Sequence, residues 1–298
     1  MNLSEDPVGA IAAQEADDVC ALPLVRRLSA TLDIDPGRWK EGQAIPRGWH
    51  LALFSVDTPQ SRVRGDGFAG LGINLPDLGL PRIVFGGRRI RFHGDIPIGA
   101  HLRRTTRLLS VAPKTGRSGR VAIVTIEHLV FIAGDDRPVI TELQDYIMRE
   151  AADPRVTVAA ADKSASAGIA PGATEKPGMP EATVRQVVVP DELLLFRVSA
   201  VMFNPHRIHY DLPYTMEREA YPALVVNGSV SSLLLLEFFR RESGLEPDFI
   251  DLRNGGLAFS GRPLRLNAVE GVRSWQVWAD NADGGMVIEG RMGVGRDE

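Results

Sequence analysis

The residues best suited to chemistry lie close together in the segment 203–211. Its polar members are Asn204, His206, Arg207, His209 and Asp211, which include two of the six histidines of the chain. A histidine exchanges protons near neutral pH because its reference pKa is about 6.5. An amide such as that of Asn204 accepts hydrogen bonds but takes up no proton. In a chain that is 44% hydrophobic, so polar a segment predicts an active-site loop.

Two apolar segments flank this loop and have to position it. Residues 193–199 form a short apolar run that we interpret as a strand. Residues 229–242 place apolar side chains on nearly every helical face, which predicts a buried helix, and Gly244 suits the position just after its end. We therefore expect the loop to lie between two elements of the core.

The chain has a duplicated layout. Residues 151–181 are rich in Ala, Ser, Gly and Pro without a hydrophobic period, which predicts a linker between the halves 1–150 and 182–298. Each half contains a Phe-x-Gly followed by proline, at Phe92 and at Phe259. Each half also ends in a predicted hairpin, formed by 121–132 with 139–148 and by 272–279 with 286–292. The agreement predicts a repeated α+β unit.

The two halves differ at one place. The stretch of the first half that corresponds to the buried helix, 65–87, is interrupted by many glycines and prolines. Because these residues disfavour a helix, we expect that helix only in the second half. The second half is therefore expected to hold the catalytic loop, and the first to leave room for a bulky substrate.

Composition limits the class of protein. A net charge of −4 argues against a nucleic-acid partner. The single cysteine, Cys20, forms no intramolecular disulfide, and the acidic, alanine-rich start does not resemble a signal peptide, so we expect a cytoplasmic protein. The longest apolar run, 129–133, is too short for a membrane span. Histidine and cysteine spacing predicts no metal site.

Several motifs carry a resemblance to a known family. They are the segment 203–214, the first-half loop Leu80-Pro81-Arg82 with Phe85-Gly86-Gly87, the turn 114–119 (Lys-Thr-Gly-Arg-Ser-Gly), and Gln144-Asp145. Together they resemble the MaoC-like double-hotdog hydratases, in particular the group of hydroxyacyl-thioester dehydratases type 2 and mesaconyl-CoA (itaconyl-CoA) hydratases. The resemblance implies an α+β double hotdog, in which each half contributes a sheet, the two sheets pack together, and the central helix belongs to the second half.

The broader family signature reads Asp-x-Asn-Pro-x-His-x-Asp. Laid on this chain, its His falls on His209 and its last Asp on Asp211. Its leading Asp falls on Asn204, so the acidic member of the usual Asp/His pair is an amide here. This departure resembles the type 2 subgroup.

The activity that the resemblance implies is reversible addition of water to a 2-enoyl-CoA thioester. This reaction needs an activated water, a proton for the α-carbon and stabilisation of negative charge on the thioester oxygen. We assign the base to His209, the positioning of water to Asn204, and the oxyanion donor to the backbone N–H of Gly228 at the start of the buried helix. No cofactor is expected, since neither redox chemistry nor a metal motif is in view.

Substrate-binding roles are implied for a further set of residues: Arg82, His206, Arg207, Asp211, Tyr214 and Asn227. Structural alternatives stay open for most of them. His206 either contacts substrate or braces the loop, and Asp211 is better suited to capping the turn into Tyr214 than to catalysis. Arg207 either meets a substrate carboxylate or pairs with an acid nearby. Asn227 and Gly228 could form only a cap and a tight turn.

The most basic stretch lies in the first half. Its arginines are Arg82, Arg88, Arg89, Arg91, Arg103, Arg104 and Arg107. Alternation along strands puts several of them on one face. We interpret this as a solvated strand face; the functional alternative is a patch for the phosphates of CoA.

The acyl group expected from the subgroup is a short, branched dicarboxylic one of the mesaconyl, itaconyl or methylfumaryl kind. Alternatives are a fatty-acid or polyketide 3-hydroxyacyl thioester dehydratase, a non-catalytic acyl-CoA-binding subunit, and a hotdog thioesterase. A thioesterase would need a carboxylate, for which Glu217, Glu219 and Glu237 are candidates. A monomer or a homodimer is expected, because two hotdog halves in one chain already cover each other's sheet edges.

Overall fold

The computed structural model describes residues 11–75, 77–116, 119–150 and 180–295. In the first half the regular elements are β1 (Gln14–Val19), α1 (Leu22–Thr31), β2 (Arg82–Phe92), β3 (His101–Gly116), β4 (Gly119–Ile132) and β5 (Ile140–Arg149). Short 3₁₀ turns lie between α1 and β2, at Pro36–Arg38, Trp49–Ala52 and Gln60–Arg62.

The second half repeats the strand-rich pattern and adds the longest helix. Its elements are β6 (Val184–Val188), α3 (Glu192–Val201), a 3₁₀ turn (Arg207–His209), α4 (Leu212–Glu217), α5 (Gly228–Ser243), β7 (Phe249–Asn254), β8 (Leu264–Val269), β9 (Ser274–Asn281) and β10 (Met286–Gly293). Both predicted hairpins are present, since β4 pairs with β5 and β9 with β10.

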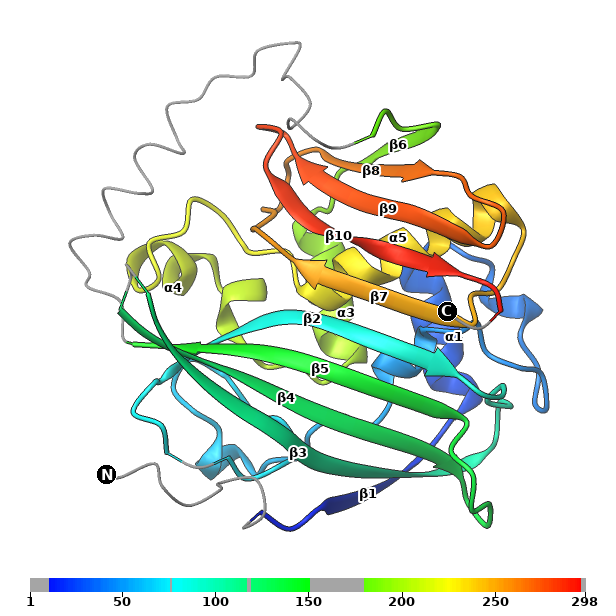
Figure 1. Ribbon diagram of the computed structural model, residues 1–298, viewed down its shortest axis with the longest axis horizontal. Helices are drawn as coiled ribbons and strands as arrows, with labels where there is room; N and C mark the ends of the chain where they lie inside the picture. Colours follow the sequence, from blue (N-terminus) through cyan, green and yellow to red (C-terminus); the bar gives the residue numbers. More distant parts are fainter. Residues whose placement is uncertain (1–10, 76, 117–118, 151–179, 296–298) are drawn as a thin grey trace.

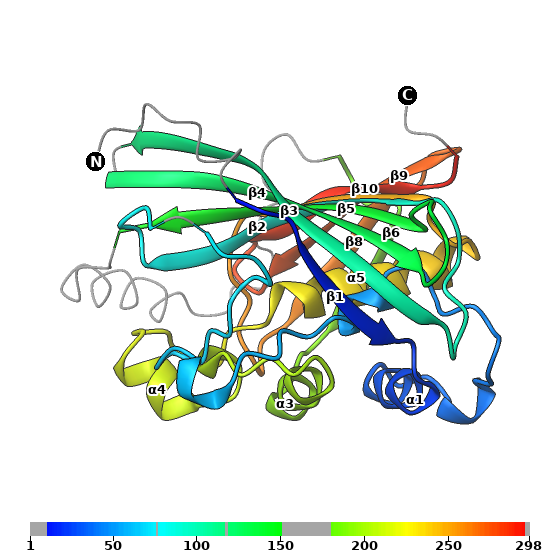
Figure 2. The same ribbon diagram turned by 90° about the horizontal axis from the view of Figure 1, so that it is seen from below.

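The strands of the described residues form one antiparallel sheet, with the order β1-β3-β4-β5-β2-β7-β10-β9-β8-β6 (Figure 1). The helices lie on one face of it, and α5 runs between the sheet and the helices α1, α3 and α4 (Figure 2). The predicted α+β class is confirmed. No helix among the described residues has the length and apolar character needed to cross a membrane.

The two halves meet edge to edge. Strand β2 pairs with β7 from Gly87↔Arg253 to Arg91↔Phe249, so the half-sheets continue into each other. The prediction that two sheets pack together is wrong in this respect. The physical reason is that β2 and β7 would otherwise present unpaired backbone groups at an edge, and pairing them satisfies both.

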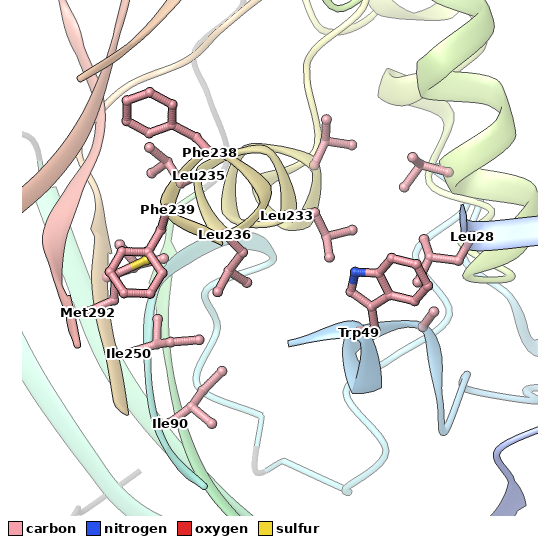
Figure 3. Packing of buried hydrophobic residues seen from close by; sticks show 14 of the residues in the cluster. Leu28, Trp49, Ile90, Leu233, Leu235, Leu236, Phe238, Phe239, Ile250 and Met292 are labelled. Atoms are coloured by element: carbon pink, nitrogen blue, oxygen red, sulfur yellow. The ribbon is translucent and has the colours of Figure 1, made fainter. Parts of the chain in front are cut away.

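Helix α5 fills the concave side of the sheet. Eight of its residues between Val230 and Phe239 are buried and lie around nearly the whole helix, as predicted. Leu233, Leu236 and Phe239 among them are at most 1% exposed. Phe239 lies beside Met292 of β10, while Leu233 points toward Trp49 on the opposite side of the helix (Figure 3). The helix begins one residue before the predicted start and ends one residue after the predicted end.

Both ends of α5 are capped by the residues that the sequence indicated. The side chain of Asn227 accepts a hydrogen bond from the Ser229 N–H at 2.7 Å. Gly244 ends the helix with a φ of 71°, a conformation that costs glycine little. The expected contrast with the first half is also present, because the described residues between 65 and the start of β2 contain no helix.

The predicted strand at 193–199 is wrong: these residues belong to α3. The Asp191 carboxylate caps this helix by accepting the Leu194 N–H at 2.7 Å. Leu195, Val198 and Ser199 are buried, at the three- and four-residue spacing of one helical face. The period of so short an apolar run does not distinguish a strand from a helix. The sequence signal for the helix was the N-cap residue Asp191.

The predicted linker, 151–181, lies outside the described residues except for its last two positions. The domain boundaries at 150 and 182 therefore stay a prediction.

Candidate active site

His209 lies at the end of the 3₁₀ turn Arg207–His209 and is 7% exposed. Its Nδ1 lies 2.8 Å from the carbonyl oxygen of Val225. Because a carbonyl oxygen only accepts, Nδ1 carries the proton and Nε2 is the acceptor of the neutral ring. Burial lowers the pKa of His209 to about 4. The side chain is thus a neutral imidazole of fixed tautomer at pH 7, the form that acts as a base.

His206 packs against His209. The two ring centroids are 5.3 Å apart and nearly perpendicular, and the other neighbour of His206 is the ring of Phe68, at 6.3 Å. Burial lowers the pKa of His206 as well. The two histidines therefore lie side by side as neutral rings. The ring contacts of His206 fit the alternative in which it braces the loop, and its substrate-binding role stays a prediction.

Asn204 shapes the loop with its side chain. Its Oδ1 accepts the backbone N–H of His206 at 3.1 Å, and its own N–H donates to Ser199 at the end of α3. Phe203 turns the chain with a φ of 49°. The amide oxygen assigned to holding water is thus partly used in a local turn. The Nδ2 group has no hydrogen-bond partner within the described part of the chain.

Arg207, Asp211 and Tyr214 form a cluster of their own. Arg207 pairs with Asp211, with Nε and Nη2 at 2.9 and 2.8 Å from Oδ2, and its guanidinium lies 4.0 Å from the ring centre of Tyr214. The other oxygen of Asp211 caps α4 by accepting the Tyr214 N–H at 3.1 Å. This N–H and the Arg207 guanidinium lower the pKa of Asp211. Of the alternatives that the sequence left open, the structure shows Arg207 pairing with an acid and Asp211 capping α4.

Gly228 is the first residue of α5, where backbone N–H groups have no partner within the helix. A Cβ atom placed there would lie 3.2 Å from the ring of Phe85 and from Nδ2 of Asn254. The glycine therefore lets the first-half strand β2 approach the helix closely. Asn227 takes the cap position, as one of its two alternatives predicted.

The loop and the start of α5 are held to each other through Val225. Its N–H donates to the Ile208 carbonyl at 2.9 Å, and its carbonyl accepts from His209. Val225 lies two residues before the cap Asn227. The structure therefore brings His209 and the N-terminus of α5 together on one short stretch of hydrogen-bonded backbone.

The first half closes over the catalytic loop, which the sequence did not indicate. The Arg207 N–H donates to Asp66 at 2.9 Å, and Ser55 Oγ donates to Met202 at 2.9 Å. Gly67 has a φ of 84°, and a Cβ atom there would overlap the carbonyl oxygen of Pro205. The glycines of 65–87 were interpreted only as helix breakers, yet Gly67 is the point of closest approach to the loop.

A buried ion pair beneath the start of α5 was also missed. Arg88 on β2 is 4% exposed; its Nη1 donates to Glu142 at 3.1 Å and its Nη2 to Ser229 Oγ at 3.3 Å. Glu142 also meets His50 Nε2 at 3.3 Å. Burial alone would raise the pKa of Glu142, but Arg88 and His50 hold it well below its usual range. The signal was a charged residue at an inward strand position of both β2 and β5.

The arginine-rich stretch thus divides between the two faces of the sheet. Arg89, Arg91, Arg103 and Arg107 pair with carboxylates on the outer face, as the solvated-face interpretation predicted. Arg88 instead is buried on the inner face, which that interpretation did not foresee. Arg82 opens β2 opposite Arg149, and none of its side-chain contacts within the described residues reaches the catalytic loop.

Two of the three carboxylates considered for a thioesterase are engaged elsewhere, and the third, Glu217, is exposed at the end of α4. Glu237 accepts the Trp49 Nε1–H at 2.7 Å and pairs with Arg240, more than two turns along α5 from Gly228. Glu219 accepts the Tyr214 hydroxyl at 3.1 Å. The described residues hold no cluster of three or more His, Cys, Asp or Glu side chains that would bind a metal ion.

The sequence model of the hydroxyacyl-thioester dehydratase type 2 family matches residues 48–259, which include the first-half loop, the buried ion pair and the catalytic loop. The chain belongs to this family. It is therefore a hydratase or dehydratase, that is, a carbon–oxygen lyase of the MaoC-like group, as the segment 203–214 predicted.

Two named relatives match this chain over most of their length. The mesaconyl-C4-CoA hydratase of Chloroflexus aurantiacus is 33% identical over 282 residues, which cover 95% of each chain. The mitochondrial hydroxyacyl-thioester dehydratase type 2 of Schizosaccharomyces pombe is 24% identical over 246 residues, 78% of this chain and 80% of that one.

Solved structures of the family's fold are also similar. A MaoC-like dehydratase of Phytophthora capsici superposes with a TM-score of 0.70 at 12% identity over all of both chains. HtdX of Mycobacterium tuberculosis gives 0.64 at 14% identity over 95% of this chain and all of that one. A further M. tuberculosis protein, described as a double hotdog, gives 0.57 at 12% identity over 95% and 94%. At such identities the likeness shows the fold alone, and it confirms the double hotdog.

Proposed function

We propose that this protein reversibly adds water to a 2-enoyl-CoA thioester whose acyl group carries a second carboxylate. The observation that carries the proposal is the state of His209: a buried, neutral base of fixed tautomer beside the N-terminus of α5. The 33% identical relative, a mesaconyl-C4-CoA hydratase, supports the dicarboxylic acyl group.

In the proposed mechanism, Nε2 of His209 removes a proton from water while the oxygen of that water bonds to the β-carbon. The electron pair of the carbon–carbon double bond moves toward the thioester oxygen and forms an enolate. His209 then returns the proton to the α-carbon, where the enolate electrons form the new C–H bond. One base thus serves both steps, which accounts for an enzyme with Asn204 where the family signature has an acid.

The enolate needs a donor, and the proposal gives this role to the Gly228 N–H. The start of a helix carries partial positive charge and unpaired amides, which favour an anion there. One such donor is worth about 2.7–4 kcal/mol in other enzymes, comparable to the roughly 10²–10⁴-fold of a positioned base. Asn204 would orient the water through Nδ2 or the second lone pair of its oxygen.

The runner-up is a 3-hydroxyacyl-thioester dehydratase with a longer acyl chain, supported by the 24% identical relative of that name. The chemistry at His209 and Gly228 would be unchanged, and only the acyl group would differ. In either case the proposed reaction needs no cofactor, because water and a thioester supply all its atoms. A cytoplasmic location and a monomer or homodimer stay predictions.

The test is a panel of thioesters. Purified protein is mixed with mesaconyl-CoA, itaconyl-CoA and crotonyl-CoA, while enoyl absorbance and free thiol are followed together. We expect loss of enoyl absorbance without thiol release, fastest with a dicarboxylic thioester. Thiol release without hydration would instead establish a thioesterase. Fastest turnover of crotonyl-CoA or longer enoyl chains would favour the runner-up.

A further inference from the structure

A row of polar side chains crosses the inner face of the first-half sheet, where apolar residues are expected. These side chains are Arg104 and Thr106 on β3, His128 on β4, Glu142 and Gln144 on β5, and Arg88 on β2. The register places Thr106 opposite His128 and His128 opposite Glu142. We call this set the inner polar row.

Most members of the inner polar row satisfy one another. Thr106 Oγ1 lies 2.9 Å from His128 Nδ1, and Gln144 Nε2 donates to Glu142 at 2.9 Å. Burial lowers the pKa of His128 to about 4, so this ring is neutral at pH 7. Glu142 is committed to Arg88 and His50. The carboxylate of the row therefore has its partners already.

Arg104 is the exception. Its one hydrogen bond within the described residues runs from Nη1 to the Phe54 carbonyl at 3.3 Å, and its Nε is buried without a partner. The guanidinium lies 4.9 Å from the centre of the Phe54 ring. No carboxylate among the described residues forms an ion pair with it. Asp18, in the adjacent edge strand β1, accepts the N–H groups of Phe54 and Val19 instead.

Such an arrangement is costly unless something compensates for it. A charge removed from water without a partner costs several kcal/mol in free energy, and buried arginines are usually paired. Arg104 is half-buried, and desolvation lowers the pKa of its guanidinium, although the charges of Glu142 and Asp18 partly offset this effect. The space beside Nη2 is kept free of a side chain, because Gly72 has a φ of 71° and a Cβ atom there would lie 3.1 Å from Nη2. This space leaves the guanidinium open to an anion that is not part of the described chain.

The inner polar row reaches the catalytic residues. Arg88 connects Glu142 to Ser229, the residue after Gly228 in the first turn of α5. The ring of Phe85, just before the Gly86–Gly87 bulge of β2, contacts both Arg88 and the start of α5. The inner polar row and the start of α5 are thus linked through Arg88.

We propose that Arg104 binds the distal carboxylate of the acyl group and thereby selects dicarboxylic over monocarboxylic enoyl thioesters. The inference rests on the proposed function and names the residue that sets its substrate class. A guanidinium fork holds a carboxylate through two parallel hydrogen bonds. Here they would use the Nε and Nη2 groups, which have no partner among the described residues. A monocarboxylic acyl group would leave Arg104 desolvated and unpaired, and this penalty is the source of discrimination.

The experiment measures kcat/KM with mesaconyl-CoA and with crotonyl-CoA for the wild type, Arg104→Gln and Arg104→Lys. The matched control is Arg103→Gln, because Arg103 is the neighbour on the outer face and pairs with Glu15 at 3.1 Å. We expect Arg104→Gln to lose roughly a hundredfold with mesaconyl-CoA, mostly in KM, while crotonyl-CoA is turned over as well as by the wild type or better, because the unpaired charge is gone. Arg104→Lys should recover part of the loss, and Arg103→Gln should behave as wild type.

An equal loss on both thioesters would assign Arg104 to holding the loop through Phe54, and no loss on either would remove it from the site; both results overturn the inference. Binding to the His209→Ala variant, measured by calorimetry, separates the inference from the reaction. A preference of that variant for mesaconyl-CoA over crotonyl-CoA, lost when Arg104→Gln is added, supports the inference even without turnover. Equal affinities for the two thioesters contradict it, whether or not the wild type hydrates them.

Discussion

At the scale of single residues, the site depends on how the protein prepares His209. The Val225 carbonyl fixes the proton on Nδ1, and burial keeps the ring neutral. A histidine prepared in this way does not need a carboxylate to set its tautomer. Asn204 in place of the signature's acid is therefore compatible with proton transfer, because its amide holds the loop and is not required to titrate.

The pH dependence of activity follows from the same residue. His209 acts as a base only when neutral, and its pKa is lowered to about 4 by burial. The acidic limb of kcat/KM should therefore lie near pH 4 instead of near the ordinary histidine value of about 6.5. Measuring kcat/KM between pH 4 and 8 in buffers of constant ionic strength checks this. An acidic limb between pH 6 and 7 would mean that the essential base is more exposed than His209.

The free energy of unfolding should also depend on pH, between about 4 and 6.5. The pKa values of His128 and His209 are lowered to about 4, while in the unfolded chain they return to about 6.5. Between these values the unfolded chain binds protons that the folded chain does not, so the free energy of unfolding falls as the pH drops from 6.5 to 4. Each histidine contributes roughly 3 kcal/mol to this loss. Urea unfolding at pH 7, 5.5 and 4.5 measures it, and a curve that is flat across this window would contradict the burial of both rings.

At the scale of elements, the catalytic loop is held from three sides. Helix α3 ends where the loop begins, Val225 ties the loop to the start of α5, and the first-half loop around Gly67 lies against it. The geometry of the base therefore depends on a residue of the other half.

Gly67→Ala tests this dependence. The new Cβ atom would overlap the Pro205 carbonyl oxygen, so the catalytic loop has to shift, and a shift of about 1 Å can cost roughly 10²-fold in rate. The matched control is Gly70→Ala, since Gly70 also has a positive φ, 111°, but faces open space. We expect kcat to fall for Gly67→Ala alone, while both variants lose similar stability. Equal activity of the two variants would separate the first-half loop from catalysis.

How much of these elements the sequence predicts depends on their length and pattern. Helix α5 was predictable because its apolar positions extend over four turns and end at Gly244. Helix α3 was not, because 193–199 is as short as a strand and its apolar residues are contiguous. His209 and Asn204 were found because they lie together in one short polar segment that resembles a family signature. Gly67 was not, because its closest contact is 138 residues away, at Pro205.

At the scale of the whole molecule, the β2–β7 pairing turns two half-sheets into one surface with α5 against it (Figure 1). This junction between β2 and β7, which we call the seam, also brings Arg88 of the first half to Ser229 of the second. Sequence periodicity separates the inner from the outer face of a strand, but it does not reveal which partner an inward charge will find. The inner polar row was therefore beyond prediction, although two of its four strands, β4 and β5, were predicted as a hairpin.

The inner polar row makes a prediction about stability across the seam. Glu142 is 4% exposed and pairs with Arg88 and His50, so Glu142→Gln leaves a buried guanidinium without its counter-charge. We expect the free energy of unfolding to fall by roughly 3 kcal/mol or more. Asp145→Asn is the control on the same strand, because the Asp145–Arg89 pair is partly solvated and should cost no more than about 1 kcal/mol. Similar losses for both variants would show that the buried pair does not stabilise the seam.

The central claim is that His209 transfers the proton in hydration, and kcat of His209→Ala tests it most directly. The assay uses whichever enoyl thioester the wild type hydrates fastest. The control is His93→Ala, since His93 is exposed on the first half and its ring nitrogen lies 3.0 Å from the Thr141 hydroxyl, its one side-chain hydrogen bond within the described residues. The account predicts that kcat falls roughly 10²–10⁴-fold for His209→Ala and stays at the wild-type value for His93→Ala. The His209→Ala variant should unfold in one cooperative transition at a lower thermal midpoint, because Val225 loses its hydrogen-bond partner. A His209→Ala variant that hydrates the thioester at close to the wild-type rate would contradict it.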